Sequence, residues 1–244
     1  MKSLIRETRA AYGRMLAKCW PALLVVFVPI EFLSAAFSFG GADDLTVLKV
    51  DHLLYDVFGI LAYAMVLRFL VAEHEGMRKS CWELLNEALH CWGRLFKAGL
   101  IVGLLGILLL CCLVVPGVIW FVFYAFTTCC VVIGGMKAQD AMAESKRLVK
   151  GAWWRTFGVF GGLFLIVAMI SFAALFGLEL GVSGLESVCG DEEFLPDWFL
   201  WVYAAKDFVG GLLTDFFGLF VGAGAGLFYF RRKKEVAESI EGSI

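Results

Sequence analysis

The sequence VVPGVIWFVFYAFTTCCVVIGG at residues 114–135, followed by MKAQDAMAESKRLVKGAWWRTFGVF at residues 136–160, decides how this chain is organised. Pro116-Gly117 predicts the tip of a hairpin that is too short to hold a domain. The apolar residues after this tip are numerous enough to cross a bilayer as a helix, and the basic segment that follows ends in a pair of tryptophans. This one stretch therefore predicts two membrane spans and the membrane surface to which they return.

The composition of the whole chain agrees with a membrane protein. It has 61% hydrophobic and 18% charged residues and a mean hydropathy of +0.82, far from the values of soluble globular proteins. The net charge is -2, and the basic residues form short clusters beside apolar runs, so we expect no nucleic-acid partner. We predict an all-α integral membrane protein in which residues 1–244 form a single polytopic domain.

Apolar runs predict six transmembrane helices in three hairpins. The last run, residues 198–230, is longer than one crossing needs, so we expect an outer interfacial piece that ends near Phe208 and a separate span after it. The six expected spans are residues 20–39, 53–72, 95–115, 116–135, 156–178 and 209–230.

The distribution of Lys and Arg predicts the orientation. Basic residues gather in the N-terminal segment, around residues 76–97, around residues 137–155 and at residues 231–234, whereas residues 179–197 carry six acids and no Lys or Arg. Because basic segments stay on the cytoplasmic side, both termini are expected in the cytoplasm. We therefore expect a multi-pass protein of the cytoplasmic (inner) membrane of a bacterium.

A basic amphipathic helix is predicted before each hairpin. Such helices lie on an anionic leaflet, so lipids of the inner leaflet are the expected partners. Ser80-Cys81-Trp82-Glu83 matches a capping box at the start of the second helix. The expected apolar faces are Leu4, Thr8, Ala11, Tyr12, Met15 and Cys19; Leu85, Ala88, Leu89, Trp92 and Phe96; and Met142, Ser145, Leu148, Val149 and Ala152.

The three units also suggest parallel internal repeats at about 1–75, 76–136 and 137–234. The units share the order of a surface helix, a basic and aromatic junction, an outward span and a return span. The alternative is that any six-span protein with basic inner loops shows this pattern.

Four ionisable residues lie within the predicted spans, where a charged side chain is costly in free energy and therefore calls for a structural or functional explanation. At about 1.5 Å per residue, Glu31 lies about 16 Å from the inner boundary and Arg68 about 8 Å from it. Asp56 and Asp215 lie near the outer edge. We hypothesise that Glu31 faces the bundle interior, neutral or paired with Arg68, and lines a polar cavity with Asp56 and Asp215. The alternative is a purely structural hydrogen-bonded pair.

Glycines in the last span suggest close helix packing. Small residues let two membrane helices approach each other, which predicts packing inside the bundle or, alternatively, a homodimer contact. The glycines concerned are Gly210, Gly211, Gly222, Gly224 and Gly226.

We find no signature of catalytic residues, and the Cys and His residues have no metal-ligand spacing. No enzyme activity, cofactor or metal is therefore expected.

PGVIW at residues 116–120 and AMAESKRLVKGAWWR at residues 141–155 resemble the YciC-like uncharacterised membrane-protein family, and the related membrane domain fused to glycerophosphodiester phosphodiesterases. The motif positions here are Pro116, Gly117, Ser145, Gly151 and Trp154. This chain has Gly134-Gly135 where that family often carries Glu. The resemblance implies a six-span membrane protein and transfers no catalytic residue.

Two functions remain open on the sequence. The first is a non-enzymatic scaffold or accessory module, with a membrane-protein partner or a second copy as possible ligands. The alternative is a small-solute or lipid transporter with a polar interior around Glu31. A transporter needs a solvated path to the middle of the membrane, whereas a scaffold can be packed shut. A membrane-embedded lipid-phosphate enzyme is a third class, which would need polar side chains clustered at the headgroup level.

Overall fold

The structure is a computed structural model that describes residues 2–39, 46, 53–189 and 199–241. Over these residues the chain is helical and contains no strand, as the apolar periodicity predicts. The elements are α1 (Lys2–Phe39), η1 (Tyr55–Gly59), α3 (Ile60–His74), α4 (Cys81–Cys112), α5 (Val114–Phe123), α6 (Thr127–Val132), α7 (Ala138–Val149), α8 (Trp153–Cys189) and α9 (Phe199–Glu241).

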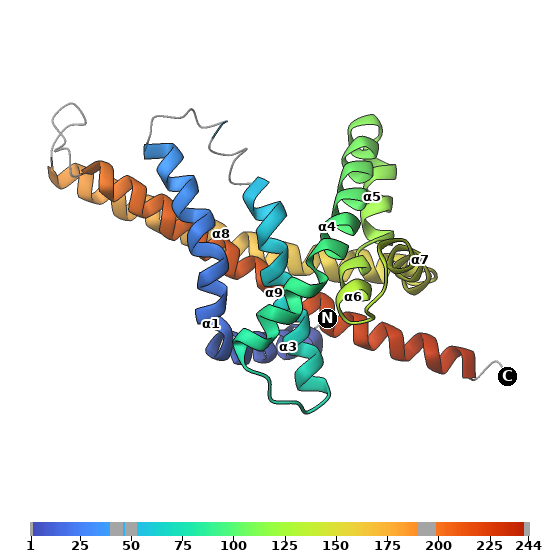
Figure 1. The fold of residues 1–244 in the computed structure, drawn as a ribbon. Helices are drawn as coiled ribbons and strands as arrows, with labels where there is room; N and C mark the ends of the chain where they lie inside the picture. Colours follow the sequence, from blue (N-terminus) through green and yellow to red (C-terminus); the bar gives the residue numbers. More distant parts are fainter. Residues whose placement is uncertain (1, 40–45, 47–52, 190–198, 242–244) are drawn as a thin grey trace.

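Six stretches within the described residues are long and apolar enough to cross a membrane. This agrees with the predicted all-α membrane fold with six spans. In Figure 1 the end of α1, the start of the η1–α3 stretch and the α4–α5 turn all lie on the upper side of the molecule. The stretches are Lys2–Phe37, Val57–His74, Cys81–Cys112, Val114–Val132, Trp153–Val188 and Phe199–Glu241.

Helix α1 joins the first predicted surface helix and the first span into one helix, which Figure 1 shows to be bent. Pro21 lies inside it, and proline bends helices because it removes a backbone hydrogen bond. The predicted apolar face of its first part is buried against protein, with Leu4, Ala11 and Met15 almost fully covered. The Tyr12 hydroxyl donates to the carbonyl of Phe216 in α9 at 2.5 Å. This part of α1 therefore packs on α9.

Helix α4 begins at the predicted capping box. The Ser80 side chain accepts a hydrogen bond from the Glu83 backbone, and the Glu83 carboxylate accepts one from the Ser80 backbone, so this prediction is confirmed. The face that packs on the bundle is rotated from the expected one: Leu89 is 51% exposed. The fully buried residues are instead Leu84, Ala88, Cys91, Leu95 and Ala98.

The α4–α5 hairpin turns at Leu113, which is the single extended residue between the two helices, and not at Pro116-Gly117 as predicted. Pro116 occupies the first turn of α5, where a missing N–H costs nothing because those donors have no partner within the helix. Gly117 faces the backbone of α4, and a Cβ there would lie 2.7 Å from Leu110 Cα. This glycine lets the two helices meet closely just below the turn.

The predicted fourth span is interrupted. It consists of α5 and α6, with a turn at residues 124–126 between them. Ser145 of α7 satisfies the backbone groups that this turn leaves without helical partners. The Phe126 N–H donates to the Ser145 hydroxyl at 3.1 Å, and that hydroxyl donates to the Phe123 carbonyl at 2.8 Å. Such breaks within a membrane span require partners of this kind.

Helices α8 and α9 form a long antiparallel pair that crosses the molecule obliquely to α1 and α4 (Figure 1). The expected separation of an outer piece from the last span near Phe208 is wrong, because α9 runs without a break from Phe199 to Glu241. A helix longer than the bilayer is thick can be accommodated by tilt, so no break is required.

Gly222, Gly224 and Gly226 of α9 are buried inside the bundle, as the packing interpretation predicts. A Cβ at Gly222 would lie 2.9 Å from the Tyr63 ring, and one at Gly226 would lie 2.6 Å from Leu70, both on α3. Gly224 faces Leu163 of α8 in the same way, at 2.5 Å. This glycine seam, defined as Gly222, Gly224 and Gly226, is occupied by neighbours within the chain.

Candidate functional site

A polar cavity of about 450 Å³ lies between α1, α8 and α9, away from the glycine seam. Helix α1 contributes one carboxylate, α8 contributes another, and the N-terminal half of α9 contributes a lysine, a threonine and two carboxylates. Leu175, Leu178 and two glycines complete the wall. The polar lining residues are Glu31, Glu179, Lys206, Asp207, Thr214 and Asp215.

Glu31 lies directly against the backbone of α9. A Cβ added at Gly211 would overlap the Glu31 carboxylate, so this contact exists because residue 211 has no side chain. Glu31 is only 6% exposed, although it comes from the middle of an apolar segment. Gly211 therefore provides the space that lets a carboxylate sit between two membrane helices.

Lys206 is the basic residue of the cavity lining. Its ammonium lies 2.9 Å from the Glu179 carboxylate, and 5.6 Å from the centre of the Tyr203 ring. Tyr203 in turn donates a hydrogen bond to Glu186 of α8. These contacts join the end of α8 to the start of α9 beside the cavity. If all its groups are ionised, the lining carries more negative than positive charge.

Two of the four predicted intramembrane residues meet in this cavity. Glu31 of α1 and Asp215 of α9 both line it, and Asp215 is 7% exposed. Asp56 belongs to η1, and its side chain lies outside the described part of the structure. Arg68 does not line the cavity, because its Nε lies 3.9 Å from the Glu87 carboxylate of α4.

Lys206 was not among the predicted site residues. It lies in the segment that the sequence assigns to the outer interface, where the positive-inside pattern predicts few basic residues. A single lysine close to a predicted outer segment that is rich in acidic residues was therefore the sequence signal that could have identified Lys206. Its partner Glu179 belongs to another helix, so the pairing itself required the fold.

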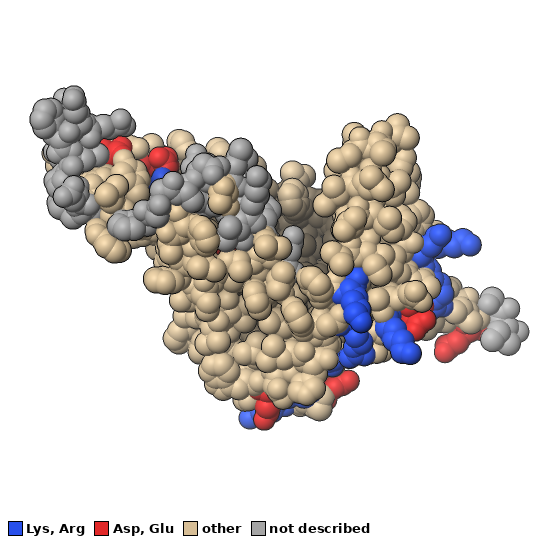
Figure 2. All heavy atoms as spheres, turned by 45° about the horizontal axis from the view of Figure 1, so that its top comes forward, with Lys and Arg blue, Asp and Glu red and all other residues tan. Residues whose placement is uncertain are grey.

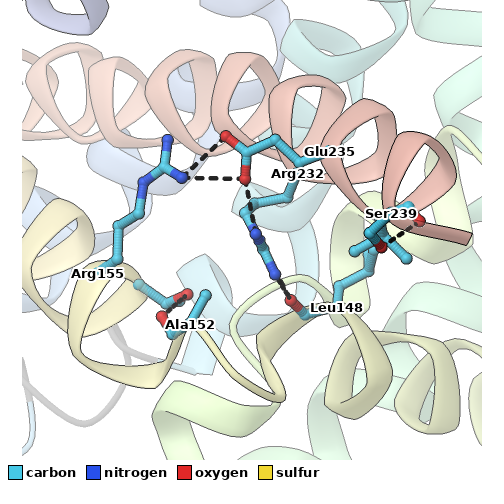
Figure 3. Close-up of polar contacts among 8 residues, drawn as sticks. Leu148, Ala152, Arg155, Arg232, Glu235 and Ser239 are labelled. Atoms are coloured by element: carbon cyan, nitrogen blue, oxygen red, sulfur yellow. Dashed lines mark hydrogen bonds and ion pairs between the residues drawn. The ribbon is translucent and has the colours of Figure 1, made fainter. Parts of the chain in front are cut away.

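The basic residues gather at the other end of the bundle, as Figure 2 shows along the lower and right-hand edges of the molecule. There, ion pairs and hydrogen bonds join helices that are distant in sequence. Arg155 of α8 pairs with Glu235 of α9 at 2.8 Å, and Arg232 bonds both Glu235 and the carbonyl of Leu148, the latter at 2.8 Å (Figure 3). Arg232 thereby satisfies a carbonyl at the end of α7. We call this group the basic-end network.

The five residues on which the sequence resemblance depends occupy defined positions in the structure. Pro116 and Gly117 lie near the start of α5, where Gly117 allows close contact with α4. Ser145 bridges the break between α5 and α6. Gly151 links α7 to α8 with a φ of +82°, a conformation that favours glycine. Trp154 lies in the first turn of α8 and is 78% exposed, so its side chain is not part of the buried core.

A scan against protein-family models, a search of curated proteins and a search of solved structures each gave no match. In the described ranges, no three His, Cys, Asp or Glu side chains come close enough together to hold a metal ion. The case for a function therefore depends on the geometry of the cavity.

Proposed function

We propose that this protein is a multi-pass membrane protein that binds a small polar solute in the cavity at Glu31 and takes part in its transport. One observation carries the proposal: Glu31 and Asp215, two largely buried carboxylates from separate apolar helices, line one cavity. Ionisable groups within membrane spans are costly and commonly mark a pathway for a solute or ion. A structural pair alone would not require a cavity beside it.

The lining indicates the class of solute. Carboxylates on α1, α8 and α9 outnumber the lysine, and the walls also contain Leu175 and Leu178. A small organic molecule with an ammonium or guanidinium group would find both charge and apolar contact there. Lys206 offers a place for a negative group if the solute is zwitterionic.

The proposed orientation places the cavity toward the outside of the cell. The positive-inside pattern assigns the basic-end network to the cytoplasm, and the cavity lies toward the opposite end of α9. Between the two, Leu67, Phe126 and Tyr229 are fully buried in the packed core. This orientation is supported by the position of the cavity, which is separated from the basic-end network by the packed core. Transport of a solute would therefore require a second conformation of the helices.

A thermal-shift panel tests the proposal with purified protein in detergent. Organic cations, zwitterions and anions of similar size are added to wild type and to Glu31→Gln. We expect members of the first two classes to raise the melting temperature of wild type only, because a ligand that binds the folded state stabilises it. Gly177→Ala is the matched control, since a methyl at this α8 position meets nothing within 4 Å.

The result that would overturn the proposal is an equal response of wild type and Glu31→Gln to every compound. A second variant, Gly211→Ala, keeps the charge of Glu31 but displaces its carboxylate. We expect it to weaken the response of the same compounds, even where Glu31→Gln is poorly folded.

A scaffold or accessory module is the second candidate, favoured by the basic-end network, which fixes α7, α8 and α9 relative to one another. A scaffold needs a rigid cytoplasmic surface and no cavity. Under this function, Glu31→Gln would restore a deletion strain as well as wild type, whereas Arg232→Gln would not.

A further inference from the structure

The basic half of the molecule contains an apolar groove that the solute proposal does not use. This groove between α5 and the start of α8 has a volume of about 550 Å³. In Figure 2 the hairpin of α4 and α5 stands apart from the main body. Its lining includes Val114, Val118, Ile119, Phe123, Trp153 and Trp154.

The dimensions of the groove suit one lipid chain. Helix α5 has ten residues and is therefore about 15 Å long, half of the roughly 30 Å hydrocarbon core. The acyl chain of a lipid in one leaflet has about this length. The wall is formed by aliphatic and aromatic side chains from both helices.

Helix α7 and the residue after it carry exposed lysines and lie at one end of α5. Ser145 bonds the Phe123 carbonyl, so α7 and the segment after it lie at the Phe123 end of α5. Lys146 and Lys150 are exposed there, and neither takes part in an ion pair among the described residues. Lys150 precedes Trp153 by three residues. By contrast, Arg155 is held by Glu235, and Arg147 by Glu144.

We propose that this groove binds one acyl chain of an anionic phospholipid, whose phosphate contacts Lys150 and Lys146. The exposed Trp154 ring lies at the boundary between chain and headgroup, where tryptophan is enriched in membrane proteins. A helix of another protein would fill the apolar groove equally well but gives no reason for two unpaired lysines at the end of α5. The charge therefore favours a lipid with a negative headgroup.

Quenching of tryptophan fluorescence tests this site. The full chain is placed in nanodiscs of phosphatidylcholine, and phosphatidylglycerol with brominated chains is added. The signal of Trp154 is isolated as the difference between wild type and Trp154→Phe. We expect half-quenching at a lower content of brominated phosphatidylglycerol than of brominated phosphatidylcholine, by about fivefold for each lysine that contacts the phosphate.

Two sets of variants make the result specific. Lys146→Gln with Lys150→Gln should remove the preference for phosphatidylglycerol, whereas Lys233→Gln with Lys234→Gln, at exposed lysines of α9, should keep it. Val118→Phe fills the groove and should reduce the quenching of Trp154 by both lipids. A melting curve of each variant shows that it is folded.

Three outcomes would overturn the proposal. They are equal quenching by the two lipids in wild type, equal loss of preference in both lysine pairs, and a covalent dimer through Ile119→Cys that shows a second copy in the groove. None of them bears on the cavity at Glu31, whose test uses soluble compounds.

Discussion

The two halves of α9 use glycine in the same way but face different neighbours. Near the basic end, Gly222 and Gly226 receive the side chains of Tyr63 and Leu70, and the contact is closed. Toward the other end, Gly211 receives the carboxylate of Glu31, and a cavity lies beside it. Close approach of helices therefore produces a packed core in one half and holds a charged group beside a cavity in the other.

The polar contacts follow the same division. At the basic end Arg14 pairs with Glu73, Arg155 with Glu235 and Arg231 with Glu7, which ties α1, α3, α8 and α9 together. Toward the cavity, the ion pair between Lys206 and Glu179 joins α8 to α9. The basic end is therefore tied across four helices.

The largest effect is expected at the glycine seam. Gly222→Leu forces a side chain into the Tyr63 ring, and overpacking of this kind costs about 3 kcal/mol. We expect a large fall in the melting temperature in detergent. Gly177→Leu, at an open position of α8, should leave it nearly unchanged. Equal melting of the two variants would show that the core is not closed at this point.

A smaller effect is expected at the break between α5 and α6. Ser145→Ala leaves the N–H of Phe126 and the carbonyl of Phe123 without their partner, which costs about 1–3 kcal/mol in a buried site. The free energy of unfolding measures this loss. Ser239→Ala removes a hydroxyl from an exposed turn of α9 and is the control. A variant as stable as this control would mean that the break does not depend on Ser145.

The sequence predicted the features that depend on local pattern. Six apolar runs, the capping box at Ser80 and the role of the α9 glycines all follow from hydropathy, cap chemistry and side-chain size. The high cost of charge in hydrocarbon also singled out Glu31 and Asp215, which the fold brings to one cavity. Pairing with Arg68 was one of the two alternatives hypothesised for Glu31, whereas Arg68 lies beside Glu87 of α4. Depth alone does not say which neighbour lies beside a residue.

The features that were not predicted depend on contacts across the fold. The turn at residues 124–126 contains only apolar and aromatic residues, and Ser145, which stabilises it, follows 19 residues after Phe126. The buried face of α4 was misassigned because lipid-facing and protein-facing sides of a membrane helix are both apolar. Leu89 is accordingly exposed, while Cys91 is buried.

At the cavity, Gly211→Ala should change the position of the Glu31 carboxylate with little effect on the stability of the protein. Gly211→Ala displaces the flexible Glu31 side chain, while alanine favours the helix by up to about 1 kcal/mol. We expect the melting temperature to stay within a few degrees of wild type and the carbodiimide modification of Glu31, followed by mass spectrometry, to become faster. Gly177→Ala should change neither value. An unchanged rate of modification in Gly211→Ala would show that this glycine does not determine the position of the Glu31 carboxylate.

The smallest effect concerns a surface pair on α7. Hydrogen bonds from Arg147 lower the pKa of Glu144 below its usual value. A carboxylate with a depressed pKa stabilises the fold above its unfolded pKa, and this contribution is lost as the pH falls through the folded pKa. For a partly exposed pair at this spacing we expect a few tenths of a kcal/mol. The difference in unfolding free energy between wild type and Glu144→Gln should therefore disappear in acid.

Thiol labelling from each side of the membrane tests the contrast between the two halves most directly. A membrane-impermeant reagent is applied to Glu31→Cys and to Leu67→Cys, which lies beside Gly226 in the closed half, with wild type as background. We expect the thiol at position 31 to react from the side opposite the termini and the thiol at position 67 to react from neither side. An unreactive thiol at position 31, or one that reacts only from the side of the termini, would contradict this expectation.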